Sequence, residues 1–434
     1  MNSPETADAA DKRPTGSAAT TTQTAGRSKP RLRALLTSFA FANLADGFTL
    51  VTLPLLAAET SRSALAVGTV AACRMVPWAL LAPALGVFAD RSALRAVLQG
   101  ANLLRASSLV LVAVAVAGGW LNIPILAAGA LLVGIGEVLY DVSAQTALPA
   151  IVSADELESA NSKQTVLGEL LNGMIGPALG GMIMAVSASW SLLSSAALYA
   201  MAILAAMRLP RLAAERSESV AGYLPSMLEG FRAIWRNPLL RVFMLMTAFG
   251  ALTFAGWQPL FALFATDKDL VGLDSFHFGL VYSIGSLGGI ALSVAAPRLI
   301  RWIPRVHMLT ASQLLGGVFL ALPVFVPTFL MASIALAGYS ACVIMWNVIT
   351  VSYRQRSVPR SILGRVNASY RALAWGLMPL GPLLGGAASS ATDSVGNGLL
   401  ALVVLSVSGA LFLPAIYRHR HALASQIEVD HARD

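Results

Sequence analysis

The chain is short of charge and of cysteine, and each shortage excludes a class of protein. Only 12% of its 434 residues are charged, against about 25% in an ordinary soluble domain, and 56% are hydrophobic. This composition excludes a soluble globular protein and a disordered chain. The two cysteines, Cys73 and Cys342, both lie in hydrophobic runs. Neither a disulfide framework nor a thiolate metal site is therefore expected.

Sequence signatures of catalysis are missing as well. None of the four lysines follows a glycine, so the chain lacks a Walker A loop, and it contains no H-E-x-x-H metal site. The five histidines lie in tails, in loops or at the edges of hydrophobic runs. We therefore expect no enzyme, no catalytic residues, no metal, and no cofactor other than a proton gradient as the energy source.

Long hydrophobic runs are what the sequence does contain. Twelve of them approach the roughly 20 residues that a membrane-spanning helix needs, and helices are expected because lipid cannot hydrogen-bond free backbone groups. Their approximate limits are 34–58, 64–88, 96–118, 124–147, 164–187, 190–208, 240–264, 277–297, 306–326, 328–351, 366–389 and 396–416. The predicted fold class is an all-α membrane protein with twelve transmembrane helices in two six-helix bundles.

The basic residues predict the orientation. Of the 30 lysines and arginines, Arg62 and Lys268 fall in loops on one side, and Arg74 and Arg105 fall inside spans. The remaining 26 lie on the other side, which the positive-inside rule identifies as cytoplasmic. We expect a multi-pass plasma-membrane protein with both termini in the cytoplasm. The net charge of +8 is then a matter of topology, and no nucleic-acid partner is expected.

The hydrophobic runs form two groups of six, separated by a polar central stretch. Hydrophobic residues from Leu224 to Trp235 in this stretch have helical spacing, which predicts a helix on the inner membrane surface. A plain linker is the alternative. The expected organisation is a disordered cytoplasmic tail (1–33), an N-terminal bundle (34–208), a central loop with the amphipathic helix (209–239), a C-terminal bundle (240–416) and a second cytoplasmic tail (417–434).

A repeated motif supports the division into halves. The segment G-P-x-x-G-G occurs in the fifth span of each group, as 176–181 and as 381–386. Matching interruptions in two halves are typical of transporters built from repeats, and proline and glycine predict a kink and close packing. The predicted hinge and seal residues are Gly173, Gly176, Pro177, Gly180, Gly181, Gly381, Pro382, Gly385 and Gly386. Glycine-rich packing without a role in transport is the alternative.

A second motif lies between spans two and three. Gly86, Asp90, Arg91 and Arg95 form the pattern G-x-x-x-D-R-x-x-x-R, which resembles the signature of the major facilitator superfamily. Gly86 would allow close helix approach, and Asp90 could accept from helix amides or a neighbouring arginine. The resemblance implies a cytoplasmic latch in the outward-facing carrier. A solvated loop whose charges only set topology is the alternative.

The wider pattern resembles one efflux branch of that superfamily, a drug/proton antiporter branch that includes the enterobactin exporter and macrolide efflux proteins. The residues that carry this resemblance include Asp46-Gly47, Leu53-Pro54, Arg74-Met-Val-Pro77, Ala147-Leu148-Pro149, Gly364-Arg365-Val-Asn367 and Trp375-Gly376. The resemblance implies that the fifth-span motif seals against a neighbouring helix and accompanies export. Span four departs from the pattern: it has Gly134-Ile-Gly136-Glu137 where many proton antiporters carry an arginine.

Five ionisable residues lie within the first six spans. A charge in a membrane is costly, so Asp46, Glu137, Asp141, Arg74 and Arg105 are the candidates for proton coupling. A carboxylate whose arginine partner moves can bind a proton on one side and release it on the other. The alternative is that Asp46–Arg74 and Glu137–Arg105 are fixed ion pairs that hold helices together.

Polar and aromatic residues at mid-depth are the candidates for a substrate cavity, although residues at such helical spacing more often serve packing than ligand binding. They are Asn43, Trp257, Gln258, Tyr339, Trp346 and Asn347. Glu169 lies near the inner end of span five and is interpreted as a side chain that reaches the membrane surface.

Together these features predict a monomeric secondary transporter whose partners are protons, membrane lipid and a small-molecule substrate. We expect it to export an amphipathic organic compound, such as an antibiotic, another secondary metabolite or a siderophore, by proton antiport with alternating access. Two alternatives stay open. One is proton-coupled uptake of a nutrient, and the other is a non-transporting membrane receptor with the same fold.

Overall fold

Helices make up the regular structure of the computed structural model, which describes residues 18–209, 220–420 and 423. Twelve helical segments within these ranges are long and apolar enough to cross a membrane, which confirms the predicted fold class. The first half contains α1 (Ala18–Thr60), α2 (Ala64–Val76), η1 (Pro77–Leu81), α3 (Ala82–Arg91), α4 (Leu94–Ala117), α5 (Ile123–Ile151), α6 (Ala154–Gly168), η2 (Glu169–Ile175), α7 (Gly176–Val186) and α8 (Ala188–Ala206).

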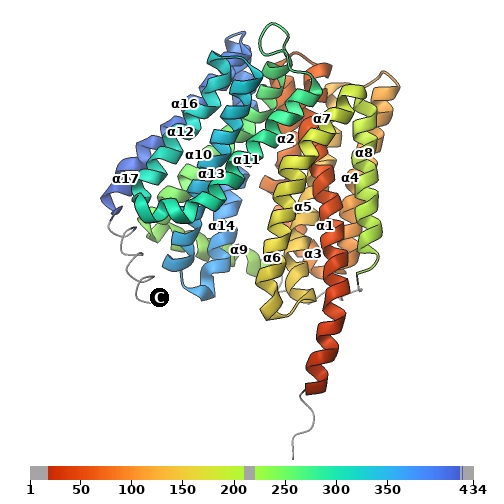
Figure 1. The fold of residues 1–434 in the computed structure, drawn as a ribbon, viewed down its shortest axis with the longest axis vertical. Helices are drawn as coiled ribbons and strands as arrows, with labels where there is room; N and C mark the ends of the chain where they lie inside the picture. The colour runs from red at the N-terminus through yellow and green to blue at the C-terminus, as the bar shows by residue number, and fades with distance from the viewer. Residues whose placement is uncertain (1–17, 210–219, 421–422, 424–434) are drawn as a thin grey trace, which may run out of the picture.

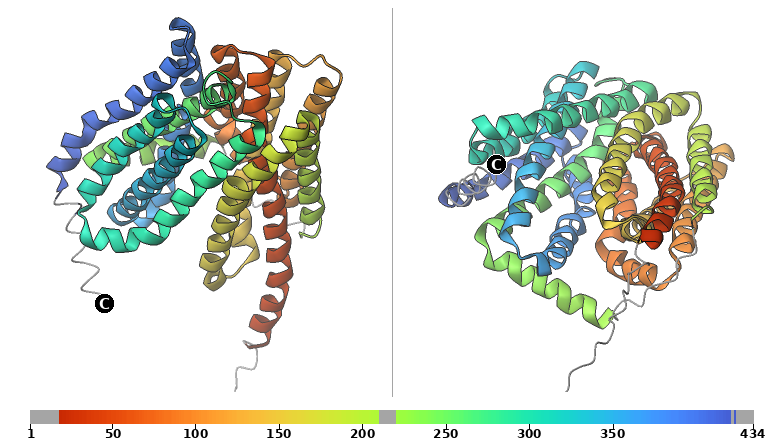
Figure 2. Two further views of the ribbon diagram at one scale, coloured as in Figure 1. Left: turned by 45° about the horizontal axis from the view of Figure 1, so that its top comes forward. Right: turned by 60° about the horizontal axis from the view of Figure 1, so that its bottom comes forward.

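The second half begins after residues 210–219, which lie outside the described ranges. It contains α9 (Val220–Arg236), α10 (Pro238–Thr266), α11 (Ser275–Trp302), α12 (Arg305–Phe325), α13 (Phe329–Ser357), α14 (Arg360–Gly376), α15 (Leu380–Ala391), α16 (Val395–Ser408), η3 (Gly409–Phe412) and α17 (Leu413–Arg418). The two halves lie side by side (Figures 1 and 2). We call the end where α1 begins and α17 ends the terminal side, and the opposite end the distal side.

Most spans predicted from the hydrophobic runs agree with the observed helices, but three helices begin earlier than predicted. Residues 18–33, predicted to be part of a disordered tail, continue α1, which projects beyond the bundle on the terminal side (Figure 1). The fifth and eleventh spans begin at Glu156 and Ser361 rather than at 164 and 366. Hydrophobicity marks only the part of a helix that faces lipid, whereas the helix itself continues into water wherever its propensity allows. Residues 1–17 lie outside the described part.

The helix predicted in the central stretch is α9, and it packs across α14. The Ser369 hydroxyl donates to the Met227 carbonyl at 2.8 Å, and Arg365 pairs with Glu229. Leu228 and Trp235 on its other face are about half exposed. This exposure suits a helix at a membrane surface, which stays a prediction.

Candidate functional site

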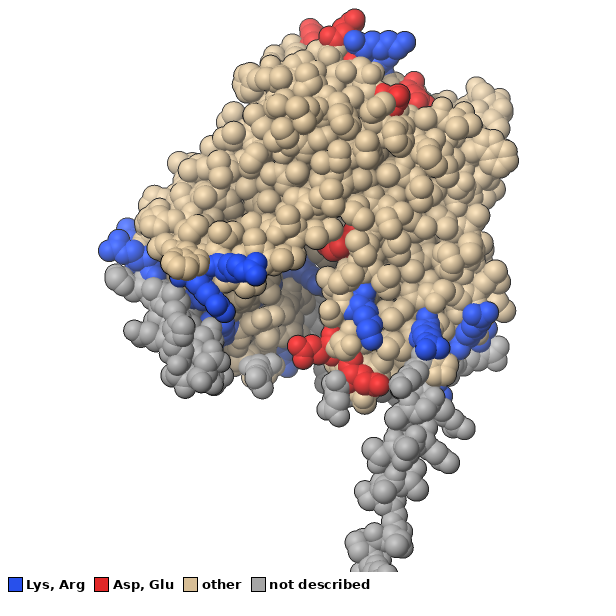
Figure 3. All heavy atoms as spheres, viewed as in Figure 1, with Lys and Arg blue, Asp and Glu red and all other residues tan. Residues whose placement is uncertain are grey.

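A cavity of about 780 Å³ lies between the two halves. Most of its wall comes from α10 to α14 of the second half, while the first half contributes Leu50, Met75 and four residues between Gly168 and Gly173. The space-filling view shows the surface hollowed between the halves on the terminal side (Figure 3). The site is therefore a chamber with two unequal walls.

Four of the six predicted cavity residues line this chamber. They are Gln258, Tyr339, Trp346 and Asn347. Trp257 does not, because it is fully buried, donates to the Leu320 carbonyl at 3.0 Å and stacks on its aromatic neighbours. Asn43 is also buried, and its amide donates to the Phe39 carbonyl at 3.0 Å. Successive helical residues point about 100° apart, so Trp257 and Gln258 face different surroundings at the same depth.

Three charged residues also line the chamber: Glu169, Arg354 and Arg371. Sequence reasoning assigned Glu169 to the membrane surface and counted both arginines among the bases that set topology. Arg354 follows the expected end of its span at 351, so its spacing did not distinguish it from those bases. Only the packing of α13 and α14 places the two arginine side chains in the wall.

Hydrogen-bonded aromatic residues make part of the second-half wall rigid. The Trp346 indole donates to the Thr247 hydroxyl at 2.9 Å, and the Thr247 and Tyr370 hydroxyls lie 2.7 Å apart. Tyr370 also donates to the Phe243 carbonyl at 2.9 Å. The Arg354 guanidinium lies over the Tyr370 ring, 4.2 Å from its centre.

The first half contains a sealed ion pair. Arg105 donates to both carboxylate oxygens of Asp46, at 2.8 and 3.2 Å, and its side chain has no exposed surface. Tyr199 also donates to Asp46, and Asn102 accepts from Arg105, each at 2.5 Å. The guanidinium lies between the rings of Tyr140 and Tyr199. We call these five residues the clamp; they join α1, α4, α5 and α8.

A second ion pair is more open. Arg74 donates from Nε and Nη2 to Oε2 of Glu137, at 3.1 Å in each case, and joins α2 to α5. Their side chains are 19% and 23% exposed. The ion pairs that the sequence suggested, Asp46–Arg74 and Glu137–Arg105, are therefore wrong, because the partners are exchanged. Depth along a helix can be read from sequence, whereas the lateral order of the helices cannot.

Two glycines of span four explain this exchange. Both arginine-bearing helices approach α5 at a glycine, since a Cβ on Gly134 would clash with the Arg74 carbonyl. A Cβ on Gly136 would lie 2.6 Å from Cγ of Arg105. Gly134 and Gly136 thus provide the space for Arg74 and Arg105 beside α5.

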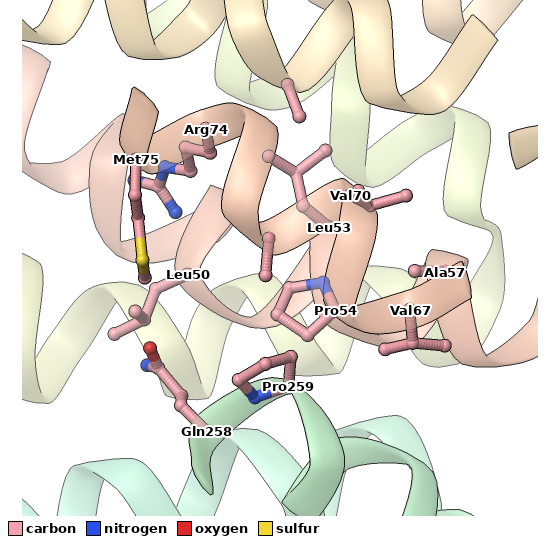
Figure 4. A pocket seen from close by; sticks show the side chains of 12 residues that line it. Leu50, Leu53, Pro54, Ala57, Val67, Val70, Arg74, Met75, Gln258 and Pro259 are labelled. Atoms are coloured by element: carbon pink, nitrogen blue, oxygen red, sulfur yellow. The ribbon is translucent and has the colours of Figure 1, made fainter. Parts of the chain in front are cut away.

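The more open pair lies beside the chamber. A small void of about 30 Å³ is lined by Arg74 and shares Leu50, Met75 and Gln258 with the chamber (Figure 4). Asp46 is not among the described residues that line either space. The two ion pairs therefore differ in their access to the substrate cavity.

Asp141 is half-buried and lies one helical turn from Glu137 towards the terminal side. The charges that act on it come from Glu137, Asp46, Arg105 and, in the opposite half, Arg371. Asp141 is thus close enough to feel the charges of acids in the first half and of Arg371 in the cavity wall.

Each repeated motif packs against a helix of the opposite half, and the two contacts involve corresponding residues of the motif. A Cβ on Gly68 of α2 would clash with the Pro382 carbonyl, and a Cβ on Gly279 of α11 would clash with the Pro177 carbonyl. The last glycines also face across, because Gly181 abuts α11 and Gly386 abuts the start of α2. These contacts form two backbone-to-backbone seals.

The other motif glycines pack within their own half. Gly176 and Gly180 abut the backbone of α1, Gly381 abuts α10, and Gly385 meets leucine side chains of α10 and α16. Each motif therefore fastens a helix to its own bundle on one face and to the opposite bundle on another.

Among the described residues, only the first motif adds hydrogen bonds across its seal. Pro177 lacks an N–H, so the carbonyl of Gly173, four residues earlier, loses its helical donor. Ser286 of α11 donates to this carbonyl at 2.6 Å, and Ser283 donates to the Met174 carbonyl at 2.5 Å. In the second motif, the carbonyl four residues before Pro382 accepts from Gly381 of its own helix, at 3.1 Å.

Among the described side chains, no hydrogen bond or ion pair joins Arg91 or Arg95 of the predicted latch to a partner. Arg91 is exposed at the end of α3 and Arg95 is half-buried in the first turn of α4, while the side chain of Asp90 lies outside the described part. A Cβ on Gly86 would lie 3.7 Å from Val142, an ordinary distance, so the close approach predicted at Gly86 stays a prediction. Trp78 and Trp375 do cross between the halves, edge to face at 4.8 Å.

Comparison with known proteins identifies a family whose sequence model matches most of the chain. The sequence model of the Major Facilitator Superfamily matches residues 35–382. An uncharacterized MFS-type transporter of Sinorhizobium fredii is 25% identical over 366 residues, covering 82% of this chain and 88% of that protein. The multidrug efflux pump Tap of Mycolicibacterium fortuitum is 25% identical over 396 residues, covering 86% and 93%. The enterobactin exporter EntS of Escherichia coli is 25% identical over 229 residues, about half of either chain.

Solved structures show the same fold at lower identity. The nucleoside transporter NupG aligns with a TM-score of 0.70 at 14% identity, covering 90% of this chain and 99% of that one. A bacterial homolog of the human lysosomal transporter Spinster, inward-facing and unoccupied, aligns with a TM-score of 0.68 at 14% identity, covering 93% and 98%. At these identities the likeness concerns the fold alone.

Proposed function

Because this chain belongs to the major facilitator superfamily, we propose that it exports a small amphipathic organic compound from the cytoplasm in exchange for protons. Antibiotics, other secondary metabolites and siderophores are the compounds in view. Relatives named as a multidrug efflux pump and an enterobactin exporter support the direction. The terminal side would be cytoplasmic, since it carries the basic excess of a multi-pass plasma-membrane protein.

The observation that carries this proposal is the chamber between the halves. Its volume of about 780 Å³ lies within the range of small-molecule pockets. It is hollowed on the terminal side, and the two glycine–proline seals join the halves elsewhere. Opening those seals while the latch at Gly86, Asp90, Arg91 and Arg95 closes would expose the chamber to the other side.

For proton coupling we favour the Arg74–Glu137 pair. It lies beside the chamber and is partly exposed, so its partners can separate and Glu137 can exchange a proton. Asp141, one turn away, would pass the change of charge towards Arg371. Asp46 and Arg105 hold each other within four further contacts. We assign this second pair to holding helices rather than to coupling.

The experiment is transport in proteoliposomes with an imposed pH gradient and a panel of lipophilic compounds. Wild type is compared with Glu137→Gln and with Asp46→Asn, each checked for folding by its melting temperature. We expect Glu137→Gln to move substrate down its own gradient but no longer against it.

Three outcomes would contradict the proposal. If Glu137→Gln still concentrates substrate under the gradient, the coupling assignment is wrong. Movement that follows protons in the same direction would indicate uptake, and a complete lack of movement across the panel would favour a non-transporting receptor.

A further inference from the structure

The chamber contains an anion-binding feature that the export proposal does not require. Given that the chamber is the transport site, we propose that the substrate is an organic anion whose carboxylate, sulfonate or phosphate group binds Arg354, with Arg371 beside it. Both arginines line the chamber, and both lie over aromatic rings, Tyr370 and Trp375 respectively.

Arg354 is held in place by its surroundings. Its guanidinium lies 4.2 Å from the centre of the Tyr370 ring, and Tyr370 is fixed by bonds to Phe243 and Thr247. Stacking occupies the face of the guanidinium and leaves the N–H groups at its edge for an acceptor. A guanidinium held in this way binds a carboxylate or phosphate with little further loss of freedom.

One N–H donor of Arg354 also lacks an acceptor in the described part of the chain. Its Nε is buried and has no hydrogen-bond partner among the described residues. Glu169, the one carboxylate among the described lining residues, belongs to the opposite wall, and no ion pair between it and Arg354 occurs in the described part. An unsatisfied buried donor costs about 1–3 kcal/mol. An acidic group on the substrate would give the Arg354 guanidinium the ion-pair partner that no described residue provides.

The charge around the chamber mouth supports the same ligand. No aspartate or glutamate lies within the second-half spans. On the terminal side of the described second half, Glu229 is the one acid, and it pairs with Arg365. Basic side chains gather along this edge (Figure 3). A basic excess on one wall of a cleft raises the local concentration of anionic ligands beside that wall.

Aromatic residues deeper in the chamber suit the rest of such a molecule. Trp346 lies eight residues before Arg354 on α13, about 12 Å along the helix. Further in, Tyr339 stacks on Phe254 with ring centres 4.7 Å apart, and both line the chamber. The substrate would therefore place its acidic group towards the terminal side and its aromatic or apolar body towards the distal side.

The test is binding to the purified full-length protein by three naphthalene probes: 2-naphthylacetate, its neutral amide and a naphthylmethyl trimethylammonium cation. We expect the anion to bind about tenfold or more tightly than the amide, as for a hydrogen-bonded charge. Arg354→Gln should abolish this preference while leaving amide binding unchanged, which also shows that the variant is folded. Arg354→Lys should restore part of it.

The matched control is Arg301→Gln, which removes an exposed arginine of the same side outside the chamber. It should leave the preference intact. The inference is overturned if the amide or the cation binds as tightly as the anion, or if Arg354→Gln keeps the preference. Transport separates this inference from the proposed function. Gradient-driven export of cations alone would overturn the inference and keep the function, whereas an anion that binds but ignores the pH gradient would do the reverse.

Discussion

The two halves share a fold and a sequence motif, yet they differ in where they keep their charges. In the first half, Asp46, Arg105, Arg74 and Glu137 are paired within the bundle. In the second half, the spans contain no acid, and Arg354 and Arg371 face the chamber. Paired charges within a bundle can hold helices or move protons, whereas charges on a cavity wall can bind a ligand. Under the proposed function, proton coupling would belong to the first half and substrate recognition to the second.

The largest expected effect concerns the clamp. Arg105→Ala should lower the free energy of unfolding by about 3–5 kcal/mol, because it leaves the buried Asp46 carboxylate without its cation. Arg74→Ala should cost less, since its side chain and that of Glu137 are about one-fifth exposed. Melting temperatures of the purified proteins in detergent measure both. Equal losses would remove the distinction between a structural and a mobile ion pair.

An intermediate effect is expected at the paired seals. In Gly68→Ala and Gly279→Ala, the added Cβ meets the Pro382 or Pro177 carbonyl, at a cost of about 1–3 kcal/mol each. The halves should separate on the distal side. Distances between spin labels at 62 and 267 measure this separation, since these side chains lie 3.9 Å apart.

The matched control for the seals is Gly250→Ala, because a Cβ at that position meets nothing within 4 Å. Its label distances should equal those of wild type. Gly68→Ala could separate the halves while Gly279→Ala does not. In that case the two seals, although alike in geometry, do not contribute equally to holding the halves together.

The smallest expected effect concerns the serine hydrogen bonds that cross the seal of the first motif. Ser286→Ala removes the hydroxyl that donates to the Gly173 carbonyl, worth about 1 kcal/mol, and should shift the ratio of open to closed distal side about fivefold. The same label distances report it. Ser293→Ala is the control, because that exposed hydroxyl bonds within its own helix. An unchanged ratio in Ser286→Ala would mean that the backbone contacts alone close both seals.

Much of the fold could be predicted from the sequence, because a segment that crosses the lipid must be a long run of mainly hydrophobic residues. Twelve hydrophobic runs and a repeated glycine–proline motif predicted the spans and the six-plus-six division. The starts of α1, α6 and α14 were misplaced, because helix propensity extends past the membrane and hydrophobicity does not report it. The helix in the central stretch was found because its hydrophobic residues follow the helical period.

The candidate site was predictable only in part. Membrane depth and residue type identified every member of the two ion pairs, but the partners were exchanged. Depth and type also selected Trp346 and Asn347 for the cavity, together with Trp257, which is core. Nothing in the spacing marked Arg354, since an arginine just beyond a span is ordinary for a cytoplasmic edge.

The sequence by itself determined which segments enter the membrane and where charge is tolerated, because both depend on the transfer of local groups between water and lipid. It also placed the proline that frees the Gly173 carbonyl. Only the tertiary structure decided which helices are neighbours, and with that the pairing of Asp46 with Arg105 and the donation from Ser286. These contacts join residues far apart in the chain, and they form only when side chains of different helices fill the same space.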